Sequence, residues 1–337
     1  MPIKFYRHGP EPTDANELRA FCHVARLLYR QYGQADEDLI LIANLQPDLD
    51  DRLAGQGLPQ LDGLLLASDL VALLEFKSYF QPIRAQSKQG RWLLVGGKRG
   101  QKNLLGGSHR NPYLQVKAAK EAWADYLQQT AGGQPWHNLH AFVLFHPYLH
   151  PDSQLVSLEE DNYWCHISSI DQIVELVLAN KAKGIQLSSG QMHRLAFATL
   201  RARPWPEIAG LLTAVVGHLY LQEPGAERPL PVTVYAFDNF TLGRRPQTHR
   251  LTLTAPCISR DHVRVEVRET AVRIYDLGSK NGSYLNGQPV DDEQGMLLQA
   301  GDVVYLGGRD GKTAVRLWFE PLARKTAVVD LPYTQTA

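Results

Sequence analysis

Cysteine is scarce in this chain of 337 residues, and the three cysteines present lie far apart. Cys22, Cys165 and Cys257 have neither the spacing of a zinc site nor that of a disulfide framework. A scattered, odd-numbered set of this kind is typical of proteins in a reducing compartment. We therefore expect a cytoplasmic protein.

Long apolar runs and an excess of one charge are also missing. No apolar run reaches the roughly 18 residues of a membrane-spanning helix, and the first residues lack the apolar core of a secretion signal. Neither secretion nor a membrane partner is therefore expected. The 35 basic residues balance 35 acidic ones, so only a local patch could attract nucleic acid.

The length exceeds that of one ordinary core, and the sequence pattern changes along the chain. Residues 1–155 alternate helices and strands, which predicts an α/β domain. Residues 156–225 predict a helical extension and linker, with helices expected at residues 168–181, 189–202 and 204–221. Residues 226–322 show short alternating strands separated by Gly, Asn and Asp, which is typical of a β-sandwich. Residues 323–337 predict a flexible tail.

Two apolar stretches, which we expect to be neighbouring strands, carry Asp62, Glu75 and Lys77. Glu75 and Lys77 point to one face of a strand, and Asp62 on the preceding strand can reach the same place. Converging carboxylates repel each other, and Mg²⁺ with oxygen ligands relieves that repulsion. A lysine there could orient a water molecule, and the metal could stabilise charge on a phosphate. The simpler alternative is a half-exposed Glu-Lys pair at a strand edge, since the tripeptide is common.

The order D-x12-E-x-K after an initial helix resembles the PD-(D/E)XK nuclease superfamily, and within it the NERD (nuclease-related) family. The resemblance rests on Glu17, on Asp62 within QLDGLLL, and on LLEFK, GRW and NPYLQ. It implies an α/β restriction-endonuclease-like fold, in which Asp62 and Glu75 bind Mg²⁺ or Mn²⁺ and Lys77 is the catalytic lysine. It also implies that Glu17 is a second acid at the metal and that Gln115 faces the site from a helix.

The segment 79–90 departs from the small polar segment that many relatives carry after the lysine, which leaves the approach of a substrate open. Many members of the superfamily also use the fold for tasks other than cleavage.

No acidic residue occurs between Ser78 and Lys120, whereas basic residues are frequent there. Positive patches bind phosphate backbones through counterion release, so a nucleic-acid partner is expected, with DNA preferred over RNA. A solvated basic surface is the alternative. The predicted nucleic-acid contacts are Arg84, Lys88, Arg91, Lys98, Arg99 and Lys102.

The C-terminal part carries G-R, S-R-x-H, D-L-G-S-x-N-G-S-x-x-N-G and L-x-x-G-D, in that order. This pattern resembles the forkhead-associated (FHA) domain over nearly its whole length. The resemblance implies a phosphothreonine site, a contact from Asn286 to the backbone of the phosphopeptide, and a structural role for His262 within the loops. The implied phosphothreonine-binding residues are Arg244, Ser259, Lys280 and Asn281.

Together these features predict a bacterial metal-dependent nuclease whose FHA domain binds a Thr-phosphorylated partner or its own phosphorylated tail. The tail contains Thr326, Thr334 and Thr336. One alternative is a non-enzymatic adaptor, in which the nuclease-like domain only binds nucleic acid or protein. Two others are a nuclease with the sandwich as a structural lid, and a sandwich that has lost phosphate binding.

Overall fold

The structure is a computed structural model. It describes residues 3–9, 14–96, 101–105, 110–156, 163–245, 251–268 and 270–322. The predictions for Lys98, Arg99 and the C-terminal tail fall outside these residues.

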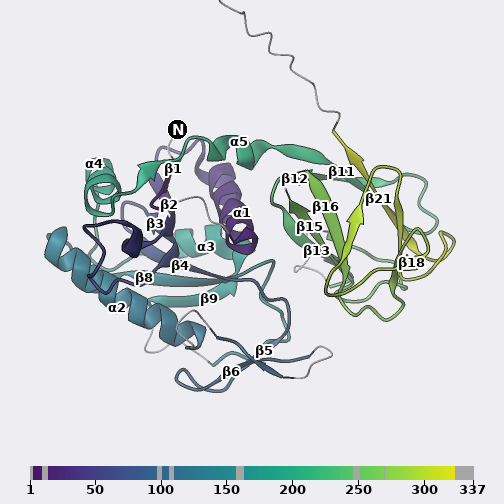
Figure 1. Cartoon of the computed structure of the whole chain (residues 1–337), viewed down its shortest axis with the longest axis horizontal. Helices are drawn as coiled ribbons and strands as arrows, with labels where there is room; N and C mark the ends of the chain where they lie inside the picture. The colour runs from purple at the N-terminus through teal and green to yellow at the C-terminus, as the bar shows by residue number, and fades with distance from the viewer. Residues whose placement is uncertain are drawn as a thin grey trace, which may run out of the picture.

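The N-terminal part is an α/β unit around a mixed seven-stranded sheet in the order β10-β1-β2-β3-β4-β8-β9 (Figure 1). Helix α1 packs on β1, β2 and β3, and α2 packs on β4, β8 and β9. Strands β2, β4 and β8 are buried along their whole length, which explains their continuous apolar sequences. The strands are β1 (Ile3–Arg7), β2 (Leu39–Leu45), β3 (Leu61–Leu66), β4 (Val71–Lys77), β8 (His140–Phe145), β9 (Cys165–Ser169) and β10 (Arg203–Pro204). The helices are α1 (Ala15–Tyr32), α2 (Pro112–Thr130), α3 (Ile173–Ala179), α4 (Ser189–Arg194) and α5 (Ile208–Thr213).

Side-chain caps set where the two long helices begin. Asp14 accepts a hydrogen bond from the backbone N of Asn16 at 2.6 Å, and Asn111 accepts one from the N of Leu114 at 2.9 Å. Both caps occupy backbone N–H groups that a helix start leaves without partners. They fix the first turns of α1 and α2, which carry Glu17 and Gln115. The chain between β4 and α2 adds a small sheet of β5 (Ile83–Ala85), β6 (Trp92–Leu94) and β7 (Lys102–Asn103).

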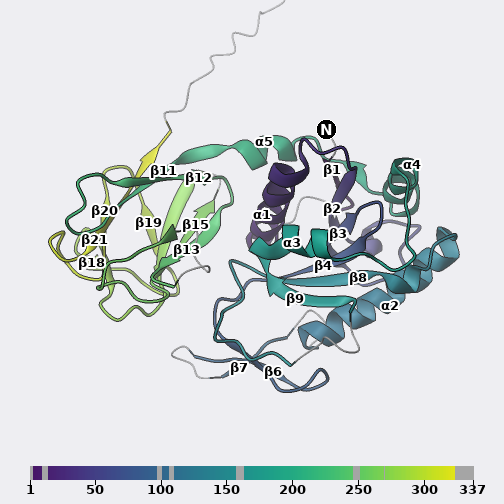
Figure 2. The ribbon, with the colours of Figure 1, turned by 180° about the vertical axis from the view of Figure 1, so that it is seen from behind.

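The C-terminal part is a β-sandwich with its own hydrophobic core, and it lies beside the α/β unit (Figures 1 and 2). One sheet has the order β12-β11-β21-β20-β17-β18 and the other β14-β13-β15-β16-β19. The strands are β11 (Val215–Gln222), β12 (Leu230–Tyr235), β13 (Asn239–Gly243), β14 (Leu251–Thr252), β15 (Val263–Arg268), β16 (Ala271–Asp276), β17 (Ser283–Leu285), β18 (Gln288–Pro289), β19 (Met296–Leu298), β20 (Val303–Leu306) and β21 (Val315–Pro321).

The helix expected through residues 204–221 is wrong in its second half. Helix α5 ends at Thr213, and Val215–Gln222 is strand β11, which pairs with β12 and β21 of the sandwich. Buried Leu219 and Leu221 alternate with half-buried neighbours, so the period of two prevails once partner strands are present. The helices before it join the core of the α/β unit through Ile173, Leu195 and Leu212.

Buried ion pairs connect the two units. Arg19 of α1 lies 2.9 Å from Glu266 of β15, and each side chain is 3% exposed. Arg26 follows about two turns later on the same face of α1. It lies 2.6 Å from Asp238 and also donates to the carbonyl oxygens of Leu212 and Ala236. Breaking a buried pair leaves an uncompensated charge, so these contacts hold the units in a defined arrangement.

Within the described residues, no helix combines the length and the apolar character needed to cross a membrane.

Candidate functional sites

The first candidate site is a cleft of about 800 Å³ in the α/β unit, where β4 ends near the starts of α1 and α2. Glu17, Asp62, Glu75, Lys77 and Gln115 all line it, so the structure brings together the five side chains predicted for one site. We call it the acid–lysine cleft.

Strand register explains this convergence. Gly63 pairs with Leu74 in the antiparallel β3–β4 ladder, so Asp62 comes opposite Glu75. Lys77 follows two residues later on the same face of β4. Ladder geometry therefore gathers two acids and the lysine at one edge of the sheet.

Gln115 of α2 completes a hydrogen-bonded triangle in the cleft. Its amide nitrogen donates to Glu75 Oε1 at 2.8 Å, and its oxygen accepts from Lys77 Nζ at 3.2 Å. Lys77 and Glu75 also form a direct ion pair, and both residues are 7% exposed. The lysine and one glutamate oxygen are therefore held in fixed positions.

The other two acids occupy unfavourable electrostatic surroundings. Burial raises the pKa of Asp62 well above its ordinary value, and Glu75 and Glu17 raise it further. The hydrogen bond from the N of Phe76 to Asp62 at 2.6 Å and the charge of Lys77 act in the opposite direction. Burial likewise raises the pKa of Glu17, with contributions from Asp14 and Glu75. Crowded carboxyls of this kind favour a proton or a cation between them.

The chemistry of these donors fits a hard divalent cation in part. Asp62 and Glu75 offer two carboxylates, and Mg²⁺ commonly takes one or two of these with water in its other positions. Among the described residues, however, no group of three or more His, Cys, Asp or Glu side chains is arranged to hold a metal. Mg²⁺ or Mn²⁺ at this place remains a prediction.

The basic residues predicted to bind nucleic acid lie in and around the small sheet. Arg84, Arg91 and Lys102 are exposed, and Lys88 is half-buried. Asn111, the cap of α2, donates to the carbonyl oxygens of Lys88 and Gly90 and so ties this segment to the helix. Lys102 does not line the acid–lysine cleft. It lines the second candidate site.

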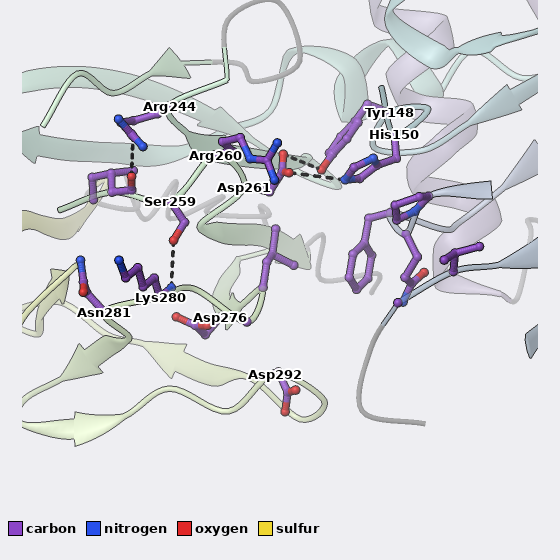
Figure 3. Close-up of a pocket in the computed structure, with 18 of the residues that line it drawn as sticks. Tyr148, His150, Arg244, Ser259, Arg260, Asp261, Asp276, Lys280, Asn281 and Asp292 are labelled. Atoms are coloured by element: carbon purple, nitrogen blue, oxygen red, sulfur yellow. Dashed lines mark hydrogen bonds and ion pairs between the residues drawn. The ribbon is translucent and has the colours of Figure 1, made fainter. Parts of the chain in front are cut away.

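The second site is a cleft of about 1180 Å³ between the two units, called here the interdomain cleft. Four of the predicted phosphothreonine-binding residues line it, and Figure 3 shows them gathered on the sandwich side. They are Arg244, Ser259, Lys280 and Asn281.

Hydrogen bonds position three of these side chains, those of Arg244, Ser259 and Asn281. Arg244 is exposed, and its Nε donates to the carbonyl oxygen of Ile258 at 2.7 Å, which directs the guanidinium. The hydroxyl of Ser259 accepts from the backbone N of Lys280 at 2.9 Å, so its own hydrogen can still be donated. Asn281 donates to the carbonyl oxygen of Cys257 at 2.9 Å. Together they present cationic and hydroxyl donors, the groups that bind a phosphate.

The loops behind these residues are braced from within, as the FHA resemblance implies for His262. This histidine is fully buried, and its Nδ1 accepts from the N of Ser259 at 2.9 Å. Gly278 and Gly282 have φ values of +74° and +76°, which residues with a side chain rarely adopt. His262 and these glycines therefore maintain the conformation of the loops that carry the phosphate-binding residues.

Asn286, predicted to contact the backbone of the phosphopeptide, forms hydrogen bonds within the sandwich. Its amide donates to Asp302 Oδ1 at 2.7 Å, and its oxygen accepts from the N of Val303 at 3.2 Å. It is not among the described residues that line the interdomain cleft. Its contact with a peptide backbone remains a prediction.

The sequence did not predict that the α/β unit would also line the interdomain cleft and contact the sandwich there. Asp261, two residues after Ser259, accepts a hydrogen bond from the hydroxyl of Tyr148 at 3.1 Å and lies 3.4 Å from Nε2 of His150 (Figure 3). Arg245 lies 3.0 Å from Asp152 and 3.3 Å from Asp261. Asp261 is the x of the S-R-x-H motif. The motif gives no signal for its contacts with Tyr148 and His150, because these residues lie more than 100 positions away in the sequence.

Comparisons with known proteins assign the sandwich. The sequence model of the FHA domain family matches residues 240–307. This part of the chain is an FHA domain. Such a domain implies phosphothreonine-dependent binding.

Individual proteins are similar to part of this chain. An oxoglutarate dehydrogenase inhibitor from Corynebacterium efficiens is 33% identical over 67 residues, which cover 20% of this chain and 44% of the relative. The chain therefore spans less than half of that protein. The FHA domain of the CT664 protein from Chlamydia trachomatis is 28% identical, with a TM-score of 0.26, and the match covers 30% of this chain and 96% of that one. The first FHA domain of Rv1747 from Mycobacterium tuberculosis is 24% identical, with a TM-score of 0.25, over 31% of this chain and 97% of that one.

Proposed function

We propose that this protein is a phosphothreonine-dependent binding protein, which recognises a phosphorylated partner through the FHA domain. The observation that carries the proposal is the arrangement of Arg244, Ser259, Lys280 and Asn281 on one side of the interdomain cleft. A guanidinium supplies charge-assisted hydrogen bonds to phosphate oxygens, and the serine hydroxyl adds a neutral donor. A protein named as an inhibitor of a dehydrogenase is 33% identical to this chain over 67 residues, and inhibition of another protein is a binding function.

Binding of degenerate peptides tests this proposal. One set has phosphothreonine at a fixed position, and matched sets have threonine or phosphoserine there. We expect fluorescence anisotropy to show saturable binding of the phosphothreonine set alone. Equal binding of the unphosphorylated set would contradict the proposal.

A second candidate function is metal-dependent hydrolysis of a phosphodiester in DNA or RNA. The observation that favours it is the convergence of two acids, Lys77 and Gln115 in the acid–lysine cleft. In this hypothesis, Asp62 and Glu75 would hold Mg²⁺ or Mn²⁺. The ion would supply Lewis-acid stabilisation of charge on the phosphate. Lys77, held by Gln115, would orient the attacking water, and Arg110 at the rim of the cleft could attract the backbone of the nucleic acid.

The test of hydrolysis is cleavage of supercoiled DNA, linear DNA and RNA with Mg²⁺ or Mn²⁺. Lys77→Ala and Glu75→Ala are compared with Lys117→Ala, an exposed lysine on α2, all prepared identically. Cleavage that needs metal and is lost in only the first two variants would establish the activity. No cleavage by the wild type would leave the binding function alone, with the α/β unit as part of an adaptor.

A further inference from the structure

The interdomain cleft has a second wall that the FHA domain does not supply. Phe80, Gln81 and Pro82 line it from the segment after β4, and Leu94 and Val95 line it from the end of β6. Lys102 of β7 adds a positive charge. At about 1180 Å³, the cleft is larger than the roughly 300–1,000 Å³ of typical small-molecule pockets, which suits a peptide.

The two walls are held in position before any ligand binds. Asp261 follows closely after Ser259 and is bound to Tyr148 and His150 of the α/β unit. The ring centroid of Phe80, on the second wall, lies 5.5 Å from Cζ of Arg264, a residue of the sandwich. Prior order of this kind lowers the entropy lost on binding, so contacts on the second wall can contribute to affinity.

The second wall is mainly apolar where it is accessible. Phe80, Pro82 and Val95 are half-buried, and so each retains surface that a ligand can cover. Phosphate contacts alone cannot distinguish one phosphothreonine peptide from another, whereas covering apolar surface rewards a particular neighbouring side chain.

We propose that a phosphothreonine peptide from a partner protein spans both walls of the interdomain cleft, with an apolar side chain next to the phosphothreonine packed on Phe80, Pro82 and Val95. The α/β unit then determines which phosphothreonine sites are bound, and Lys102 favours an acidic residue close by. This inference rests on the proposed phosphothreonine binding and specifies the chemistry of the ligand.

The test uses the full chain after phosphatase treatment, so that its own threonines carry no phosphate. A degenerate phosphothreonine peptide library identifies the preferred peptide of the wild type, and Ala-phosphothreonine-Ala serves as the minimal probe. We expect Phe80→Ala and Val95→Asp to weaken the preferred peptide about tenfold, in the range of interface hot spots, and to change the minimal probe less than about twofold. Leu93→Ala, at a half-buried position of β6 that does not line the cleft, should change neither.

The possible outcomes separate this inference from the proposed function. Unchanged selection and affinity in Phe80→Ala and Val95→Asp would overturn the two-wall site while phosphothreonine binding stands. Absence of all phosphopeptide binding by the wild type would overturn both. Displacement of the bound peptide by a DNA duplex, but not by excess minimal probe, would assign the second wall to nucleic acid and contradict the inference. Val95→Ala is included in case the aspartate variant fails to fold, and it should weaken the preferred peptide severalfold.

Discussion

The two clefts of this molecule differ in how their polar groups are satisfied. In the acid–lysine cleft, Lys77 and Gln115 both bind Glu75, so much of the hydrogen bonding is internal. In the interdomain cleft, Arg244 and Ser259 each form a hydrogen bond with the backbone. These bonds orient the guanidinium and the hydroxyl, which can still donate hydrogen bonds to a ligand. Internal pairing serves stability, whereas an exposed and directed guanidinium serves recognition. Polar side chains thus have different consequences in the two clefts.

The clefts also share parts of the chain. Ser78 and Tyr79 line the acid–lysine cleft, and the next three residues line the interdomain cleft. Helix α1 also connects the acid–lysine cleft to the sandwich, because Glu17 lines that cleft and Arg19 binds Glu266 of the sandwich. A ligand in one cleft therefore contacts elements that also form the other.

The largest expected effect is on folding, from Lys77→Met. This change leaves Glu75 and Asp62 close together without their cation, and losing one partner of a buried pair costs about 3–5 kcal/mol. We expect urea unfolding, followed by tryptophan fluorescence, to show a loss of about 3 kcal/mol. Lys117→Met, which removes an exposed pair with Glu121, should cost less than about 0.5 kcal/mol. A gain in stability would instead indicate that the native cleft is strained, as catalytic sites are.

The next largest effect is on binding, from Arg244→Ala. Losing hydrogen bonds from a charged donor costs about 1.5–3 kcal/mol, or about 10- to 100-fold in the dissociation constant of a phosphothreonine peptide. Stability should change little, because the side chain is exposed. Arg228→Ala, at another exposed position of the C-terminal half, is the matched control for charge. Equal affinities of Arg244→Ala and wild type for the peptide would mean that Arg244 does not bind the phosphate. The interdomain cleft would then not differ from the acid–lysine cleft in serving recognition.

A smaller effect is expected from Asp261→Ala, which removes the acceptor of Tyr148 and the partner of His150. The loop that carries Ser259 would lose its anchor on the α/β unit, so we expect peptide binding to weaken by about 1 kcal/mol, the value of one ordinary hydrogen bond. Isothermal titration calorimetry measures the change, and Asp36→Ala, exposed and remote in sequence, controls for charge. Unchanged affinity would show that the FHA loops hold their shape without the α/β unit.

Local sequence patterns predicted much of this structure. Strand periodicity together with the E-x-K spacing predicted that Asp62, Glu75 and Lys77 would meet, which depends on a ladder between adjacent strands. The FHA motifs predicted four residues of the interdomain cleft, because glycine turns and phosphate-binding side chains recur at fixed intervals.

Features that depend on distant partners were not predictable in this way. Strand β11 follows α5 in one apolar run, and only pairing with β12 and β21 decides between helix and strand there. Arg19 and Arg26 bind acidic partners that lie more than 200 residues away in the sequence, so no local pattern identifies these ion pairs. The second wall of the interdomain cleft likewise exists only because two units dock.

The smallest effect that we expect is the pH-dependent part of the stability contributed by the contact between the two units. Burial alone would raise the pKa of Glu266, but Arg19, Arg268 and Arg264 outweigh it, and the pKa lies below its ordinary value of 4.5. A carboxyl with a lowered folded-state pKa stabilises the fold above the pKa of the unfolded chain, and this contribution is lost as the pH falls through the folded value. Glu266→Gln should therefore be less stable than wild type at pH 6, and the difference should shrink as the pH falls below 4.5. Urea unfolding at pH 6 and at pH values below 4.5 measures this difference in the free energy of unfolding. The exposed Glu227→Gln is the control. A difference independent of pH would mean that packing, rather than charge, joins the sandwich to α1.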